Sequence, residues 1–485
     1  VTTGAGADTI DGGLGNDTID AGEGNNSVLG GDGDDSVSSG SGNDTVNGGK
    51  GDDTITITGG DNTVTGGDGN DDVTTGDGAD IIDGGNGNDV ITGDDTSTGA
   101  GGDDEITGGA GEDTIDAGGG NNTVYGDSPG DPSAGDDDSI TSGGGNDTIE
   151  GGGGNDVINA GDGENDVEGG DGNDSVTTGS NDDTVTGGDG NDTINAGDGE
   201  NTVDGGDGND VITTGGQNDT VIGGLGDDTI NAGDGENDVE GGDGNDSVTT
   251  GSNDDTVTGG DGNDTINAGD GENTVDGGDG NDVITTGGQN DTVIGGLGDD
   301  TINGGEGDNT VTGGEGNDDV TTGDGNDTID GGAGNDIISA GDGNNSVDGG
   351  TGDDDITTGG GSDTITGGDG ADTITSGAGN DDLIYDPFSD FITSNAVVDS
   401  IDAGAGEDRV IIEDTAGWTI STGNLDDRIQ NVESISLGDT PAGYGSINIA
   451  LDDTDVLASG LHTIDLSGDS SNGQGNSVDL SGVSD

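Results

Sequence analysis

Several kinds of residue are nearly absent from this chain of 485 residues, and each absence narrows its function. There is no Cys, which excludes disulfides, thiolate metal sites and cysteine nucleophiles. Only three residues are Lys or Arg against 109 Asp or Glu, so the net charge is -106. Nucleic acid is excluded as a partner because binding phosphate needs a positive surface. No apolar run is long enough to insert into a membrane.

Apolar residues make up 22% of the chain and aromatic residues 1%, so composition alone predicts a disordered, self-repelling polyelectrolyte. The chain also has no Met. Val1 is therefore not a translation start, and we expect further residues upstream. Glycine is abundant, at 119 residues, but it does not recur at every third position and there are only four Pro, which excludes collagen.

A nine-residue repeat overturns the prediction of disorder. Residues 12–20 read G-G-x-G-x-D-x-U-x, where U is a large aliphatic residue, and units of this kind fill residues 3–92, 99–125 and 133–384. These stretches hold ten, three and twenty-eight units, forty-one in all. The sixth position is always Asp or Asn, and the eighth is Ile or Val except for Leu383. Two inserts, 93–98 and 126–132, interrupt the repeat, and we expect them to form surface loops.

Each unit has a turn half and a strand half. The G-G-x-G-x-D segment is turn material, because glycine allows positive φ and Asp or Asn bonds its local backbone. The last three positions alternate polar, apolar and polar, as a short strand with one buried side chain does. Two units then make an 18-residue coil, and stacked coils predict an all-β fold, a parallel β-solenoid with two sheets.

These units resemble the calcium-binding nonapeptides of the repeats-in-toxin (RTX) family, and the resemblance covers about three quarters of the chain. It implies a parallel β-roll in which the turns of successive coils hold Ca²⁺ ions between them. In that family the sixth-position Asp supplies carboxylate oxygen, and turn carbonyls supply the remaining ligands.

The two edges of the expected roll differ. On the first, here called the G-G edge, units open with Gly-Gly, except that Ser133-Ala134 opens the unit of Asp138. Its candidate calcium ligands are Asp17, Asp35, Asp53, Asp71, Asp89, Asp113, Asp156, Asp174, Asp192, Asp210, Asp228, Asp246, Asp264, Asp282, Asp300, Asp318, Asp336, Asp354 and Asp372.

On the second edge, here called the mixed edge, units mostly open with Ala, Thr or Ser, and the sixth position mostly alternates Asp with Asn. We expect weaker or partly empty calcium sites there, because Asn offers a neutral oxygen; a plain turn-forming role for Asn is the alternative. The candidate ligands are Asp8, Asp44, Asp80, Asp104, Asp147, Asp183, Asp219, Asp255, Asp291, Asp327, Asp363 and Asp381.

Calcium is expected to be needed for folding. The column of aliphatic side chains is small against the entropy of ordering the repeats, and more than a hundred like charges oppose compaction. A hard divalent cation held by carboxylates and carbonyls removes this repulsion, so folding and binding become one event. With twenty units on one edge and twenty-one on the other, ions between neighbouring turns number 39 at most.

The amino-acid composition changes and the repeat weakens over residues 385–485. Five of the six aromatic residues lie between 385 and 444, and residues 397–412 hold two degenerate units around Asp399 and Asp408. Strands are expected at 409–412, 418–421, 434–437, 446–451, 462–466 and 477–480, and a short helix at 452–458. We interpret 1–384 as the β-roll and 385–485 as an irregular β-rich region that caps it, since an open sheet edge exposes unpaired backbone. A docking module is the alternative.

An enzyme is not expected. There is no H-E-x-x-H motif, the one G-x-S-x-G string, G-D-S-P-G at residues 126–130, falls in the second insert, and the one histidine, His462, lies in a strand-like run. Glycosidase carboxylate pairs are an alternative use of the acidic residues, but without an aromatic-lined cleft they are better interpreted as metal ligands.

We interpret the chain as an extracellular, calcium-folded structural protein secreted by a bacterium and assembled into a surface layer, fibre or matrix. The partners considered are calcium, further copies of the chain joined head to tail at its uncapped first unit, and cell-surface polysaccharide. A stalk of a larger adhesin is the main alternative. An ice-binding roll fits less well because T-x-T triplets are scattered, and acidity suited to a saline habitat is compatible with any of these functions.

Overall fold

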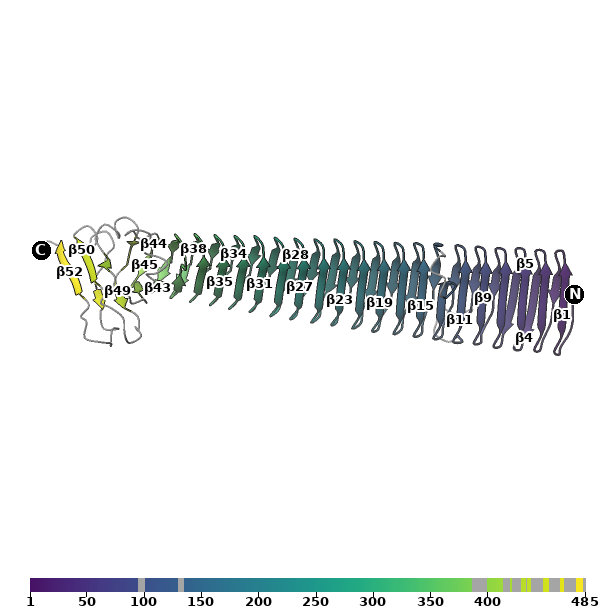
Figure 1. Ribbon diagram of the computed structural model, residues 1–485. Helices are drawn as coiled ribbons and strands as arrows, with labels where there is room; N and C mark the ends of the chain where they lie inside the picture. Colours follow the sequence, from purple (N-terminus) through teal and green to yellow (C-terminus); the bar gives the residue numbers. More distant parts are fainter. Residues whose placement is uncertain are drawn as a thin grey trace, which may run out of the picture. The chain divides into compact units, whose positions relative to one another are not determined.

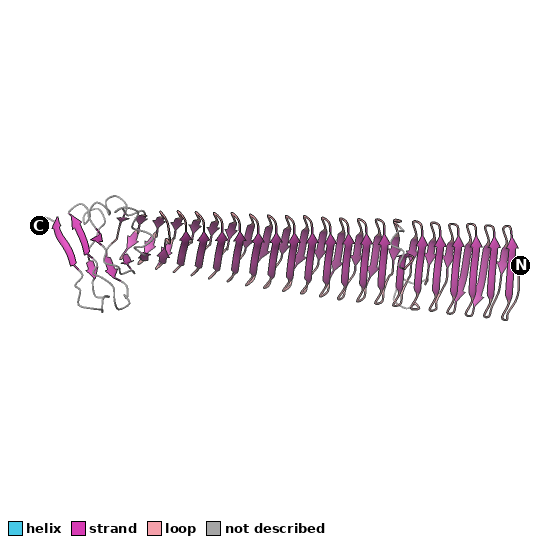
Figure 2. Ribbon diagram, viewed as in Figure 1, coloured by secondary structure: helices cyan, strands magenta, loops and turns pink. Residues whose placement is uncertain are grey.

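The computed structural model describes residues 1–94, 101–129, 135–385, 399–412, 419–420, 429–432, 434–437, 448–452, 463–465 and 477–482. Within these ranges the chain forms strands and turns and no helix (Figure 2). Accordingly, no helix able to cross a membrane occurs in this described part. The chain divides into two units, Val1–Gly251 and Ser252–Asp485, each a stack of parallel strands.

In the first unit, odd-numbered strands form one sheet and even-numbered strands form the other (Figure 1). The odd strands are β1 Thr9–Leu14, β3 Ser27–Asp32, β5 Thr45–Lys50, β7 Thr63–Asp68, β9 Ile81–Asn86, β11 Glu105–Ala110, β13 Thr123–Asp127, β15 Thr148–Gly153, β17 Asp166–Asp171, β19 Thr184–Asp189, β21 Thr202–Asp207, β23 Thr220–Leu225 and β25 Asp238–Asp243. The even strands are β2 Thr18–Asp20, β4 Ser36–Ser41, β6 Thr54–Gly59, β8 Asp72–Thr74, β10 Val90–Thr92, β12 Thr114–Asp116, β14 Ser139–Thr141, β16 Val157–Gly161, β18 Ser175–Thr178, β20 Thr193–Gly197, β22 Val211–Thr214, β24 Thr229–Gly233 and β26 Ser247–Thr250.

The second unit repeats this arrangement. One sheet holds β27 Thr256–Asp261, β29 Thr274–Asp279, β31 Thr292–Leu297, β33 Thr310–Glu315, β35 Thr328–Ala333, β37 Ser346–Thr351, β40 Thr364–Thr366, β43 Asp382–Tyr385, β46 Arg409–Ile412, β49 Ser434–Leu437 and β51 Thr463–Asp465. The other holds β28 Thr265–Gly269, β30 Val283–Thr286, β32 Thr301–Asn303, β34 Asp319–Thr321, β36 Ile337–Ser339, β38 Asp355–Thr357, β41 Thr373–Thr375, β44 Ser400–Asp402 and β48 Ile429–Gln430. Two small sheets consist of β39 Gly360–Gly361, β42 Ala378–Gly379 and β45 Ala405–Gly406, and of β47 Thr419–Ile420, β50 Asn448–Asp452 and β52 Ser477–Gly482.

The strands pair in parallel with a shift of 18 residues, as the repeat predicts. Ile10 of β1 pairs with Val28 of β3, and Ile19 of β2 pairs with Val37 of β4. The aliphatic residue at the eighth position points into the coil: Ile19 is 1% exposed, while its neighbours Thr18 and Asp20 are exposed. The core of each unit is therefore a ladder of Ile and Val between two sheets, and the predicted β-solenoid is confirmed.

Both inserts begin two residues later than expected. The backbone N–H of Gly93 donates to the carbonyl of Asp116, and that of Asp94 donates to the carbonyl of Ala117, so both residues belong to the coil. Gly126 and Asp127 likewise lie in β13, where Asp127 pairs with Gly109. They take the first two turn positions that we assigned to residues 133 and 134, which lie outside the described residues. The predicted register of this unit was therefore wrong. The short sequence fits the repeat in either register, and pairing with the next coil determines which register forms.

Beyond residue 384 the stacking continues. Sheet pairing runs from β43 to β46, β49 and β51, and the expected strands of this region are confirmed. Of the helix expected at 452–458, Asp452 instead ends β50, and the remainder lies outside the described residues, as does His462. The cap or docking role of 385–485 stays a prediction.

Candidate metal centre

A ladder of side chains runs along the G-G edge. The backbone N–H of each sixth-position Asp donates to Oδ1 of the Asp one coil further on: Asp17 to Asp35 and Asp35 to Asp53, both at 2.7 Å. Asp35 and Asp53 are only 3% and 2% exposed. The fold therefore fixes these carboxylates inside the turn, one coil apart, through one of their two oxygens.

The second oxygen, Oδ2, is different. On this edge, many sixth-position Asp residues have a buried Oδ2 with no hydrogen-bond partner among the described residues. These residues are Asp17, Asp35, Asp53, Asp71, Asp89, Asp113, Asp138, Asp156, Asp174, Asp192, Asp210, Asp228, Asp282, Asp300, Asp318, Asp336, Asp354 and Asp372. A buried, unpaired carboxylate oxygen is costly unless it is protonated or meets a cation.

The pKa values of these carboxylates show that their ionised form is disfavoured when no cation is present. Burial, with the charges of neighbouring carboxylates, raises the pKa of Asp113 to about 7, of Asp138 to about 8 and of Asp156 to about 7. The chain's own cations lie elsewhere: in the described residues Lys and Arg form two ion pairs, Lys50 with Asp32 at 3.7 Å and Arg409 with Asp382 at 2.6 Å. Both pairs lie on the sheet surface, where water screens them.

Glycine at the first turn position makes room for Oδ2. A Cβ on Gly187 would lie 2.4 Å from Oδ2 of Asp192 and 2.4 Å from the carbonyl oxygen of Gly205 in the next coil. The glycines at the second and fourth turn positions, such as Gly188 and Gly190, have φ of 118° and 139°, which other residues rarely adopt. The G-G-x-G pattern therefore lets the backbone close tightly around the carboxylate.

The available donors suit calcium. They are carboxylate and carbonyl oxygens, the ligands that Ca²⁺ prefers. Among the described residues no three acidic or imidazole side chains gather at one point, so any ion must take much of its coordination from turn carbonyls. The column of unpaired, buried Oδ2 atoms is the observation that fits a cation to this edge.

The mixed edge keeps the Oδ1 ladder but changes the second atom. Asp147 donates its backbone N–H to Oδ1 of Asn165 at 3.1 Å, and Asn165 donates in turn to Oδ1 of Asp183 at 2.8 Å. The Asn165 amide nitrogen donates to the carbonyls of Gly161 and Gly163 of its own turn, both at 3.2 Å. Asn and Asp thus share one structural role and differ in what they present to the inside of the turn.

Every candidate ligand lies on its expected edge, and the structure adds residues that were not among the candidate ligands. Asp138 joins the G-G column, because Gly126 supplies the glycine that its unit lacked. Asp399 and Asp408 continue the two ladders, accepting from the N–H groups of Asp372 and Asp381. Asp94 and Asp127, the buried second residues of the interrupted turns, are also new. For Asp94 and Asp127 the only sequence signal is the Gly-Asp motif that precedes each insert.

Comparison with known proteins agrees with this geometry. The RTX calcium-binding nonapeptide repeat matches the chain fourteen times, in segments that together cover residues 1–128 and 134–392. No curated protein matches the chain significantly. Since the matched segments span well over half of its length and the coils they form carry the repeat's Asp column, the chain belongs to the RTX calcium-binding nonapeptide repeat family.

Proposed function

We propose that this chain is an extracellular structural protein that folds into a rigid β-roll when it binds calcium. The observation that carries the proposal is the column of buried Asp carboxylates on the G-G edge, in most of which Oδ2 has no hydrogen-bond partner in the described residues. Their summed charge opposes stacking of the coils, and the two ion pairs of the described residues leave it uncompensated.

The residues divide the work of folding. The aliphatic ladder, from Ile19 and Val37 onward, buries the apolar surface, and the backbone N–H to Oδ1 bonds set the spacing of the carboxylates. On the G-G edge, Oδ2 of the sixth-position Asp and the carbonyls of the turn then hold the ion. Calcium supplies the positive charge that lets these carboxylates stay ionised while buried.

The place of action follows from the ion. Proteins with RTX repeats are typically secreted by bacteria, and calcium modules outside cells work at affinities of about 10⁻⁴ to 10⁻³ M. A chain with these properties stays unfolded where calcium is scarce and folds after export. We therefore place the protein at the bacterial cell surface or in its surroundings.

The proposed role at the surface is mechanical. Residues 160–231 and 232–303 are identical, a duplication that adds four coils without changing any local contact pattern. Such growth suits a spacer, fibre or lattice element better than a catalytic scaffold. Copies joined head to tail, or attachment to cell-surface polysaccharide, would build a layer or matrix; as an alternative, the roll is the stalk of a larger adhesin.

Negative-stain electron microscopy of the full chain in millimolar calcium, before and after chelation, tests this proposal. Filaments or sheets that disappear on chelation support calcium-dependent assembly. Separate particles that lose their shape on chelation retain the calcium-folded roll and favour the stalk. Particles unchanged after chelation, with calcium loss verified by elemental analysis, would refute the proposal.

A further inference from the structure

On the mixed edge, the residue at the first position of a unit varies together with the residue at its sixth position. Where the sixth residue is Asp, the first is Thr or Ser, as in Thr178 with Asp183; where the sixth is Asn, the first is Ala, Gly or Ile, as in Ala160 with Asn165. Between Thr3 and Ile384 the only unit of this edge that departs is that of Asp104, which the first insert interrupts and which has Gly93 in first place. A rule this regular indicates one shared arrangement of hydrogen bonds.

The Asn amide fills the place that Oδ2 takes on the other edge. In the turn of Asn26, Nδ2 donates to the carbonyl of Gly24 at 2.8 Å and to that of Gly22 at 3.3 Å. At least one such bond to a carbonyl of the same turn is made by Asn62, Asn165, Asn201, Asn237, Asn273, Asn309 and Asn345. These carbonyl oxygens accept hydrogen bonds from the side-chain amide of their own turn, which takes the place of a cation.

The amide cannot simply turn over to offer its oxygen. Oδ1 of Asn26 accepts the backbone N–H of Asp8 at 3.1 Å, and a flipped amide would place its NH₂ group against that donor. The ladder therefore fixes Nδ2 on the inside, where a cation between this turn and the next would face its hydrogens.

Hydroxyl groups complete the arrangement in three of the Asp turns. Nδ2 of Asn26 also donates to Oγ of Ser39 at 3.3 Å, and Ser39 donates to Oδ2 of Asp44 at 2.6 Å. Thr322 and Thr358 donate in the same way to Oδ2 of their own Asp, at 2.7 and 2.6 Å, respectively. In these three turns the oxygen that stays unpaired on the G-G edge has a partner, whereas Oδ2 of Asp147, Asp183, Asp219 and Asp291 is buried with no hydrogen-bond partner in the described residues.

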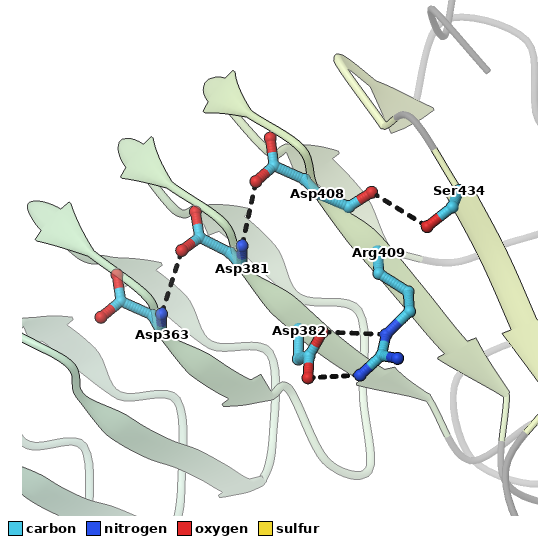
Figure 3. A network of polar contacts seen from close by, with 6 residues as sticks. All are labelled: Asp363, Asp381, Asp382, Asp408, Arg409 and Ser434. Carbon is cyan, nitrogen blue, oxygen red and sulfur yellow. Dashed lines mark hydrogen bonds and ion pairs between the residues drawn. The ribbon is translucent and has the colours of Figure 1, made fainter. Parts of the chain in front are cut away.

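Successive Asp turns without an intervening Asn are rare on this edge. They occur at Asp80 and Asp104, beside the first insert, and at Asp363, Asp381 and Asp408 (Figure 3). Oδ2 of Asp80 and of Asp104 is buried and has no partner in the described residues, and the same holds for Oδ1 of the neighbouring Asp94, which is 3% exposed. The carboxylate of Asp94 is held by the N–H of Gly102 at 2.7 Å.

We propose that each Asn amide of the mixed edge keeps calcium out of the positions beside it, so that this edge binds cations only at these two runs of neighbouring Asp turns. This inference rests on the proposed calcium-dependent folding of the G-G edge. It makes the roll asymmetric: one edge responds to calcium along its whole length, while the other responds only at the two runs of neighbouring Asp turns. Total calcium then falls to roughly half of the maximum of 39.

An anomalous difference map from crystals of the full chain grown in calcium chloride tests the inference without a substitution. Peaks are expected between turns of the G-G edge, beside Asp80 and Asp104, and beside Asp381, with none next to Asn165 or Asn201. Peaks next to the Asn turns would overturn the inference and leave the proposed function standing. A folded chain with no peaks on either edge would overturn both.

A matched pair of variants tests the amide itself. Asn165→Asp replaces the inner donor with an acceptor between two Asp turns, so bound calcium should rise by about one or two ions per chain. Asn146→Asp makes the same charge change at the exposed fifth position of the preceding turn on this edge and should add none. Equilibrium dialysis with elemental analysis counts the ions. Equal counts in Asn165→Asp and the unsubstituted chain would show that the amide does not decide occupancy.

Discussion

The backbone N–H of Asp174 donates to Oδ1 of Asp192 at 2.7 Å, eighteen residues further on, while Oδ2 of Asp192 is buried with no partner in the described residues. One carboxylate thus carries two roles. Oδ1 belongs to the permanent structure of the roll, and Oδ2 is left for a cation. A substitution that keeps the first role and removes the second separates folding geometry from calcium binding.

Asp192→Asn is that substitution. Asn keeps an oxygen for the N–H of Asp174 but places an NH₂ group where the ion is proposed to lie, so the two neighbouring ion positions weaken. We expect the calcium concentration at half-folding to rise and the stability in calcium to fall by roughly 1–3 kcal/mol. Asp189→Asn, an exposed change of equal charge in the same coil, is the control, and denaturant unfolding in calcium measures both. Equal stability of the two variants would contradict the proposed role of Oδ2.

Adding a methyl group at the first glycine of a G-G turn should disrupt the roll. In Gly187→Ala the new Cβ would lie 2.4 Å from both Oδ2 of Asp192 and the carbonyl oxygen of Gly205. Relieving such crowding costs about 1–3 kcal/mol. In the control Gly216→Ala the nearest atom is the carbonyl oxygen of Asp234 at 3.9 Å, so thermal unfolding should be nearly unchanged. A larger loss in Gly216→Ala than in Gly187→Ala would contradict the described turn.

The aliphatic ladder should dominate stability in the presence of calcium. Ile212 is 1% exposed at the eighth position, whereas Ile222 of β23 is 37% exposed on the sheet surface. Ile212→Ala should therefore cost about 2–5 kcal/mol, and Ile222→Ala well under half of that. Urea unfolding in saturating calcium compares them, and similar losses would argue against the assigned core.

Acid should partly replace calcium in the metal-free chain. Burial raises the pKa of Asp138 to about 8 and of Asp113 to about 7, against about 3.9 for an unfolded Asp. The folded chain then binds more protons than the unfolded chain, so protonation stabilises the fold fully below about pH 3.9, and this stabilisation is lost as pH rises through 7 to 8. Circular dichroism in EDTA should show more β-structure at pH 5.5 than at pH 8.5. Less structure at the lower pH would contradict the buried column.

Much of the fold was predictable because its determinants are local and repeated. Aliphatic residues such as Ile19 and Val37 recur every nine residues, and stacked coils of two units bury all of them. The pairing of strands 18 residues apart follows from this stacking. The assignment of Asp residues to two edges follows from the same periodicity. The place of Asp192 and its counterparts in the turns was therefore predictable from the sequence, while their role as calcium ligands stays a prediction.

The parts that were missed depend on contacts between coils. Whether Gly126 or Ser133 opens the turn of Asp138 is decided by the chain that pairs with it, which the local motif does not contain. The link between Ser39 and Asp44 spans five residues, but its meaning emerges only when the amide of Asn26 in the preceding coil is seen donating to Ser39. Periodicity locates such residues, whereas their hydrogen-bond partners require the stacked structure.

Circular dichroism of the full chain, titrated with calcium at pH 7.5 from a metal-free start, tests the central claim most directly. The account predicts a disordered spectrum without calcium and a cooperative change to β-structure as calcium is added, reversed by EDTA. A full β-spectrum in the verified absence of calcium, unchanged by its addition, would contradict the claim that the ion is part of the fold.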